Sequence, residues 1–131
     1  MIELSIKCPF CGQSLMDKEH LIDNCPGIKV IIEWKEKQGW AYLSALYGSY
    51  NTEYEFPRPK GEIGKFFCCH CKKELTSTRK CEECGAPMVR LDVMEGGILQ
   101  ICSRRGCKRH CIEFERLETE LRAFYNAHGV L

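Results

Sequence analysis

The residues of this chain that could do chemistry are above all its cysteines, of which there are eleven among 131 residues. Six of them form C-x-x-C pairs, a spacing in which a tight turn lets two thiolates converge on one metal ion. These pairs are Cys8 and Cys11, Cys68 and Cys71, and Cys81 and Cys84. Because a structural metal site takes four such ligands, each pair must be completed by ligands from elsewhere in the chain.

The three pairs belong to a longer repeat, C-x-x-C-x-x-x-[LM], which ends at Leu15, Leu75 and Met88. We expect each turn to bury this apolar side chain beneath its metal. Two sites result if the first pair joins the second, and if the third joins two later cysteines across a hairpin. The predicted ligands are Cys8, Cys11, Cys68 and Cys71 in site 1, and Cys81, Cys84, Cys102 and Cys107 in site 2.

A second partition of the ligands makes three sites. It groups Cys8, Cys11, His20 and Cys25, then Cys68, Cys71, Cys81 and Cys84, and finally Cys102, Cys107, His110 and Cys111. The two-site partition is preferred, because it uses the predicted hairpin between Cys84 and Cys102 to return the chain to one ion. It leaves without metal the residues Cys25, Cys69, Cys111, His20, His70, His110 and His128.

Zinc is the expected metal, because four thiolates in a tetrahedral array suit it, and iron is the alternative. The segment from Met1 to Ser14 contains two cysteines and no apolar core, so it does not read as a secretory signal. We therefore expect a cytoplasmic protein, in which thiols stay reduced. No apolar run approaches the roughly 20 residues of a membrane span.

The elements that must position these cysteines are mostly strands. Alternating apolar residues or short apolar runs predict strands over 2–7, 28–35, 40–47, 50–56, 88–93 and 98–101, with a turn of helix over 17–22 and reversals at 24–27 and 37–39. From Ile112, apolar residues recur at three and four positions as far as Phe124, which predicts an amphipathic helix.

The fold class expected is therefore a small, metal-stabilised, mainly β protein with two zinc ribbons and a C-terminal amphipathic α-helix. The predicted organisation is a split ribbon over residues 1–76 holding an inserted antiparallel sheet, a second ribbon over 77–111, and the helix over 112–131.

Residues 81–108 resemble the C-terminal zinc ribbon of bacterial type IA topoisomerases, through C-x-x-C-G-A-P-M-V, Gly97, Cys102-Ser103 and Cys107. The resemblance implies a zinc-stabilised hairpin that helps to hold single-stranded DNA. Arg104-Arg105-Gly106 stand where that family usually has an aromatic residue. The spread pairs of site 1 are similar to those of small acetone-carboxylase subunits, and the C-P-x-C-G turn is similar to rubredoxin, which implies iron.

The formal net charge is only +1, but basic residues concentrate in the middle of the chain. Residues 65–111 hold ten Lys and Arg against five Asp and Glu, whereas residues 1–64 hold seven against nine. The basic side chains beside the cysteines either neutralise a metal site of formal charge −2 or contact phosphates. The candidate nucleic-acid contacts are Lys72, Lys73, Lys80, Arg104, Arg105, Lys108 and Arg109.

The sequence shows no order of triad residues, phosphate-binding loop or dinucleotide fingerprint, so an enzyme is not expected. The first hypothesis is a non-catalytic interaction module, an accessory or regulatory subunit that presents its tyrosines between Tyr47 and Tyr54 and its C-terminal helix to another protein. The second is nucleic-acid binding. The third is redox chemistry, through rubredoxin-like iron or through the spare thiols Cys69 and Cys111.

Overall fold

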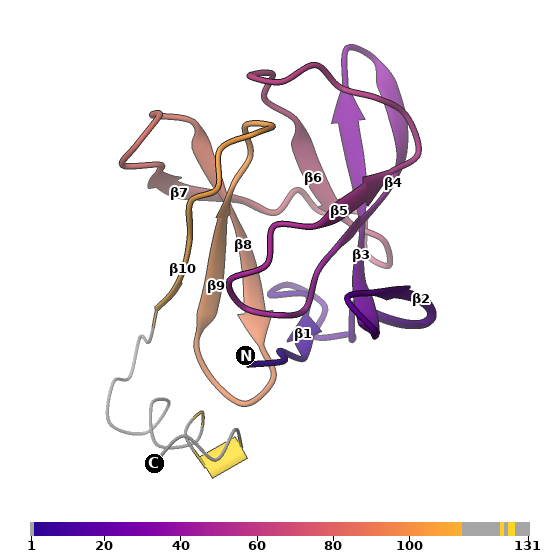
Figure 1. Cartoon of the computed structure of the whole chain (residues 1–131), viewed down its shortest axis with the longest axis vertical. Coiled ribbons are helices and arrows are strands. Elements are labelled where there is room, and N and C mark those ends of the chain that lie inside the picture. The colour runs from indigo at the N-terminus through magenta and orange to yellow at the C-terminus, as the bar shows by residue number, and fades with distance from the viewer. Residues whose placement is uncertain (1, 114–123, 125, 128–131) are drawn as a thin grey trace.

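The computed structural model describes residues 2–113, 124 and 126–127, and their architecture is mainly β (Figure 1). Two five-stranded antiparallel sheets account for the strands of this part of the chain. The strands are β1 (Ile6–Lys7), β2 (Met16–Ile22), β3 (Cys25–Trp34), β4 (Lys37–Leu43), β5 (Thr52–Tyr54), β6 (Lys65–Cys68), β7 (Thr76–Lys80), β8 (Pro87–Val93), β9 (Ile98–Cys102) and β10 (His110–Glu113). The mainly β class predicted from the sequence is confirmed.

The first sheet has the order β2-β3-β4-β5, and β6 also pairs with β3. The second sheet has the order β1-β8-β9-β10, and β7 also pairs with β8. In each sheet four consecutive strands form hairpins, β2 to β5 in the first sheet and β7 to β10 in the second. The fifth strand pairs with β3 in the first sheet and with β8 in the second, so each of these two strands has three partners. In Figure 1 the second sheet lies on the left and the first sheet on the right.

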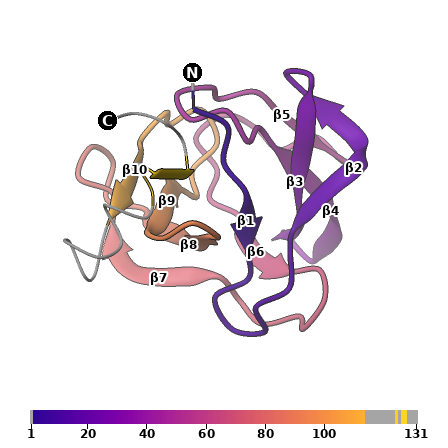
Figure 2. The same cartoon turned by 90° about the horizontal axis from the view of Figure 1, so that it is seen from below.

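Two strands are exchanged between the sheets. Strand β1 pairs with β8 of the second sheet, with Ile6 opposite Val93, although β2, which follows β1, belongs to the first sheet. Strand β6 pairs with β3 of the first sheet, with Phe66 opposite Ile32, although β7 belongs to the second. The chain therefore crosses between the sheets twice, each time through a C-x-x-C turn, and Figure 2 shows these two turns side by side at its lower edge.

The backbone hydrogen bonds show that residues 62–113 repeat the fold of residues 2–54. Leu15 N donates to Ile6 O at 2.9 Å, and Leu75 N donates to Phe66 O at 2.8 Å. Further along, Tyr47 N donates to Ile2 O at 2.8 Å, and its counterpart in the second half runs from Arg105 N to Glu62 O at 2.9 Å. The two halves are therefore related by an approximate two-fold axis, which relates β1 to β6 and β3 to β8.

The core fills the space between the sheets and beneath the cysteine turns. Leu15, Leu75 and Met88 are each 1 % exposed, which confirms that every C-x-x-C turn buries the apolar residue four positions on. Burying one such side chain contributes about 1.5 to 3 kcal/mol. The turns are thus anchored by apolar packing as well as by their thiols.

The helical turn predicted over 17–22 is wrong, because these residues form β2. Asp23 and Asn24 close the β2–β3 hairpin with φ of 56° and 62°, a left-handed turn that Asp and Asn tolerate. Pairing of Met16 with Ile28 and of Ile22 with Cys25 then fixes the strand. The predicted turn over 24–27 accordingly lies mostly within β3.

Other boundaries also differ from the expectations. The reversal predicted over 37–39 falls at Lys35 and Glu36, whose φ values are 47° and 67°, and the strand predicted over 50–56 is reduced to β5. Strands β6, β7 and β10 were not predicted. Ile112 and Glu113 lie in β10, and the helix predicted beyond them lies outside the described residues. Within the described residues, no helix has the length and apolar character that crossing a membrane takes.

Candidate metal centres

Site 1 brings together the first two cysteine pairs at the point where the chain crosses between the sheets. The Sγ atoms of Cys8, Cys11, Cys68 and Cys71 all lie within 4.8 Å of one another. Cys8 Sγ is 3.7 Å from Cys71 Sγ, and Cys11 Sγ is 3.8 Å from Cys68 Sγ. The approximate two-fold axis exchanges these two contacts.

Site 2 lies at one end of the second sheet. The Sγ atoms of Cys81, Cys84, Cys102 and Cys107 also lie within 4.8 Å of one another. Cys81 Sγ is 3.8 Å from Cys107 Sγ, and Cys84 Sγ is 3.4 Å from Cys102 Sγ. The hairpin of β8 and β9 returns the chain to the third cysteine pair.

These separations fit a shared metal ion. Four sulfurs placed tetrahedrally about 2.3 Å from one ion lie about 3.8 Å apart, whereas a disulfide needs about 2.05 Å. Three of the four distances above are within 0.1 Å of the tetrahedral value, and the eight thiols are free. Each site can therefore hold one metal ion with four thiolates, which leaves no open coordination position.

The three turns that present the cysteines have the same backbone. In each, the amide after the second cysteine donates to the carbonyl of the first, from Gly12, Lys72 or Gly85, at 3.0, 3.1 and 2.9 Å. These residues have φ of 74°, 66° and 79°. The positive φ predicted for Gly12 is confirmed, and the second turn places a lysine in the same left-handed conformation.

Each site contains thiols in contrasting environments. The backbone N–H of Lys73 lowers the pKa of Cys71 to about 7, and the N–H of Ala86 lowers the pKa of Cys84 to about 6. Burial raises the pKa of Cys8 to about 12 and also raises the pKa of Cys102. In each site an outer thiol thus ionises readily, whereas a buried thiol needs the positive charge of the metal to lose its proton.

The structure does not bring together the first two groups of the three-site partition. Cys68 and Cys71 lie with Cys8 and Cys11 rather than with the third pair. The His20 ring stacks on Tyr42, with ring centroids 3.7 Å apart, and hydrogen bonds to Glu53. Among the residues that the structure describes, the two groups in which four ligands meet are those of the two-site partition.

A polar cluster occupies the place in the first half where the second half has site 2. Ser44 N bonds to Asn51 O at 3.1 Å as Cys102 N bonds to Arg109 O at 3.0 Å, and Ser49 N bonds to Leu46 O as Cys107 N bonds to Arg104 O. Ser44 and Ser49 are therefore the counterparts of two metal ligands. Both hydroxyls donate to Asp23 Oδ2, at 2.5 and 2.6 Å, and Asn51 Nδ2 donates to Oδ1 at 2.7 Å.

The sequence carried a signal for this cluster that we did not use. The two serines have the same spacing as Cys102 and Cys107, and in both segments a glycine stands directly before the second residue. Hydrogen bonding from the two hydroxyls and the amide lowers the pKa of Asp23, which is thus a carboxylate at neutral pH. One acidic residue and three neutral hydrogen-bond donors thus lie at the end of the first sheet. The equivalent place in the second sheet holds the four thiols of site 2.

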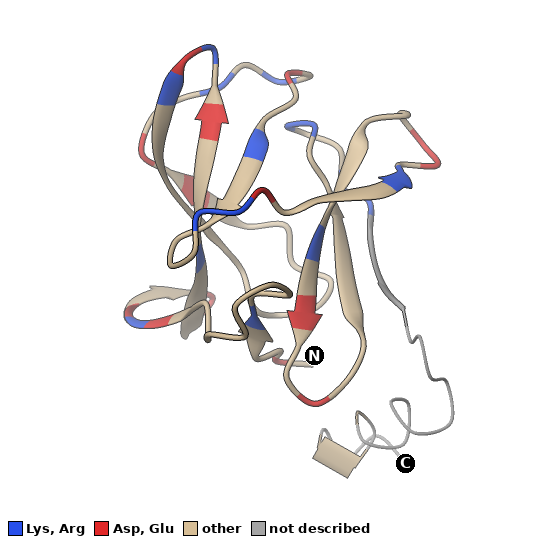
Figure 3. Ribbon diagram, turned by 180° about the vertical axis from the view of Figure 1, so that it is seen from behind, with Lys and Arg blue, Asp and Glu red and all other residues tan. Residues whose placement is uncertain are grey.

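The seven candidate nucleic-acid contacts do not all line one cleft, and Figure 3 shows basic and acidic residues along both sheets. Arg104, Arg105, Lys108 and Arg109 line a cleft between the two halves, whereas Lys72, Lys73 and Lys80 do not. Lys73 Nζ lies instead 5.3 Å from the ring centroid of Phe10, across site 1.

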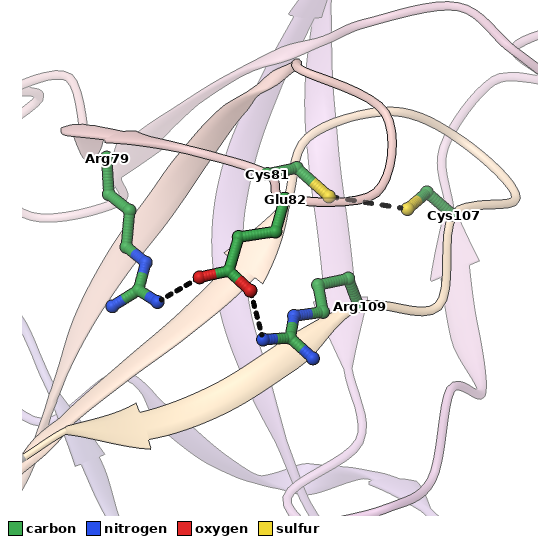
Figure 4. A network of polar contacts seen from close by, with 5 residues as sticks. All are labelled: Arg79, Cys81, Glu82, Cys107 and Arg109. Atoms are coloured by element: carbon green, nitrogen blue, oxygen red, sulfur yellow. Dashed lines mark hydrogen bonds and ion pairs between the residues drawn. The ribbon is translucent and has the colours of Figure 1, made fainter.

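Glu82, which follows the first ligand of site 2, forms ion pairs with two arginines (Figure 4). Its carboxylate oxygens lie 3.2 Å from Arg79 Nη2 and 3.2 Å from Arg109 Nη2. Arg104 instead donates to Gly61 O at 2.8 Å and to Cys84 O at 3.5 Å, and hydrogen bonding to the Cys84 thiolate raises its pKa. Part of the basic cluster therefore serves site 2 itself.

Comparisons of the chain with family models, with curated proteins and with solved structures find no match.

Proposed function

We propose that this protein is a non-catalytic, zinc-stabilised interaction module that acts in the cytoplasm as an accessory or regulatory subunit of another protein. The observation that supports it best is that both metal centres are closed sets of four thiols. A zinc ion bound by four protein ligands offers no position for a substrate or an activated water. Its contribution is to the folding free energy of the domain.

The proposal of a structural role is also supported by where the centres lie. Site 1 stands where β1 and β6 cross between the sheets, and site 2 closes the β8–β9 hairpin. A domain of this size buries a modest fraction of its surface, so two metal centres at these positions supply much of its stability. Burial raises the pKa of the spare thiol Cys69, which opposes a role as a reactive thiolate.

The test is elemental mass spectrometry of protein purified anaerobically without added metal, together with native mass spectrometry. Two zinc ions per chain are expected, and removing them with a chelator should unfold the domain. Iron would contradict the proposal in favour of electron transfer. Affinity purification of the tagged, zinc-loaded chain should recover one stoichiometric partner protein, and a chain that recovers none would contradict the accessory role.

A second candidate function is nucleic-acid binding, favoured by the four basic side chains that converge on one cleft. Phosphate contacts of this kind give binding that weakens with rising salt. Electrophoretic mobility shifts with single-stranded and duplex DNA and RNA at low salt test this function. Absence of any shift would remove it and leave the accessory role untouched.

A further inference from the structure

The cleft between the two halves has facing walls made by equivalent loops. Residues 44–51 follow β4, residues 103–109 follow β9, and side chains from both loops line a space of about 240 Å³. Figure 2 shows these loops at the end of the molecule opposite the cysteine turns of site 1. Apolar side chains that include Leu43, Phe66 and Leu99 complete the lining.

The two walls share a backbone but carry different side chains. Gly48 and Gly106 occupy equivalent positions, with φ of 97° and 91°. Counting from these glycines, Tyr47 is the counterpart of Arg105, and Tyr50 is the counterpart of Lys108. Because either side chain is compatible with the same loop, the fold requires neither, and the difference gives the cleft one aromatic wall and one basic wall.

The charge of the cleft is positive. Five basic side chains and no Asp or Glu line it, namely Arg58, Arg104, Arg105, Lys108 and Arg109. A zinc ion with four thiolates in site 2 brings a formal charge of −2, and Glu82 offsets Arg109. Neither Arg105 nor Lys108 forms an ion pair with a described residue, so positive charge remains at the open edge.

Arg58 adds a cation within the cleft. Its side chain is 3 % exposed, it donates from Nη1 to Ser103 O at 3.1 Å, and Nε has no hydrogen-bond partner among the described residues. The guanidinium lies 5.5 Å from the Tyr54 ring centroid and 5.7 Å from that of Phe66. A buried guanidinium without a carboxylate is costly, and an anion in the cleft would relieve that cost.

We propose that this cleft binds a nucleotide, with its phosphate at Arg105 and Lys108 and its planar base against Tyr50 and Tyr54. Phosphate recognition by cations and stacking on aromatic rings are the two interactions that nucleotides offer together. Lys108 Nζ already lies 5.7 Å from the Tyr50 ring centroid, so the two kinds of contact meet at one edge of the cleft. The ligand is either a free nucleotide or one nucleotide of a single strand, and the proposal rests on the second candidate function.

The test is fluorescence anisotropy with the full-length, zinc-loaded protein and a labelled oligothymidylate at low salt. Thymidine monophosphate and inorganic phosphate serve as unlabelled competitors. The cleft variants are the double variant Arg105→Ala/Lys108→Ala and the single variant Tyr50→Leu. The matched control, Lys18→Ala/Lys37→Ala, removes the same charge from exposed positions outside the cleft.

We expect each cleft variant to weaken binding at least about fivefold, the lower limit for losing one stacked base. In the double cleft variant, the slope of log affinity against log salt concentration should also fall by the amount that about two phosphate contacts contribute. The control should retain at least half of the affinity of the natural protein. Competition by the mononucleotide would identify a free nucleotide as sufficient, and competition only by longer strands would identify a strand.

Two results would overturn the proposal. If neither the strand nor the mononucleotide binds, the cleft is not a nucleotide site, and the mobility shifts with duplex DNA and RNA decide separately whether the second candidate function fails as well. If the strand binds but the lysine control weakens it as much as the cleft variants do, nucleic-acid binding stands and only its placement in the cleft is wrong. Zinc content and circular dichroism of every variant establish that the fold is intact.

Discussion

Cys8 Sγ lies 3.7 Å from Cys71 Sγ although the two residues are 63 positions apart in the chain. Each belongs to a turn that leads out of one sheet and into the other, so site 1 joins both strand exchanges at once. A metal ion here would be bound by two separate turns rather than by a single hairpin. It fixes the positions of the two sheets relative to each other.

Substitution Cys71→Ser is expected to reduce bound zinc from two ions to one per chain and to lower the melting temperature of both sheets. The free energy of binding a structural zinc ion, about 10 to 16 kcal/mol in small modules, is part of the folding free energy. Elemental analysis and thermal unfolding followed by circular dichroism measure the two effects. Cys25→Ser, at a half-buried cysteine outside both sites, is the control and should retain both ions.

The correspondence of Ser44 and Ser49 with Cys102 and Cys107 predicts that a third metal site can be built. The variant replaces Asp23–Asn24 by the sequence of residues 81–86 and carries Ser44→Cys and Ser49→Cys. We expect it to bind one more zinc ion than the natural chain, because the equivalent backbone already positions these two side chains. Native mass spectrometry under non-denaturing conditions counts the ions.

The matched control for this design carries the same loop replacement with Ser44 and Ser49 unchanged. It should not bind the additional zinc ion, since two thiolates alone do not complete a structural site. A full design that binds no extra ion while remaining folded would show that the two halves are not equivalent at this position.

Gly64→Ala is expected to destabilise the fold by about 1 to 3 kcal/mol, the usual cost of overpacking. A Cβ atom at this position would lie 2.3 Å from Arg58 Nη1 and 3.1 Å from Ile32 Cδ1, so the buried guanidinium would have to move. Urea unfolding measures the loss. In the background Arg58→Ala the same substitution should cost much less, and an equal cost in both backgrounds would contradict this explanation.

The stability of the protein should fall at high pH through Tyr42. Burial, together with the 2.7 Å hydrogen bond that its hydroxyl donates to Asp17 Oδ2, raises the pKa of Tyr42 to about 12 from an ordinary value of 10.0. The neutral phenol therefore stabilises the fold fully below pH 10, and this contribution is lost as the pH rises towards 12. Tyr42→Phe cannot ionise here, so melting temperatures of the two proteins should converge over that interval. A constant difference would contradict the assignment.

The sequence by itself determined the local chemistry of this protein. The C-x-x-C spacing dictates a tight turn, which gives Gly12 its positive φ and directs Leu15 and Leu75 into the core. The glycines between residues 93 and 98 likewise specify the β8–β9 hairpin, which brings Cys102 back to Cys84. These features depend on contacts within a few residues, so a linear pattern is enough to predict them.

Only the tertiary structure decided how these pieces combine. Residues 17–22 became a strand because β3 pairs with them, and β7 formed because β8 offers it an edge. The exchange of β1 and β6 between the sheets rests on pairings across most of the chain, which no local spacing encodes. The same long-range packing sets equivalent loops face to face, so that tyrosines from one half and cations from the other share one cleft.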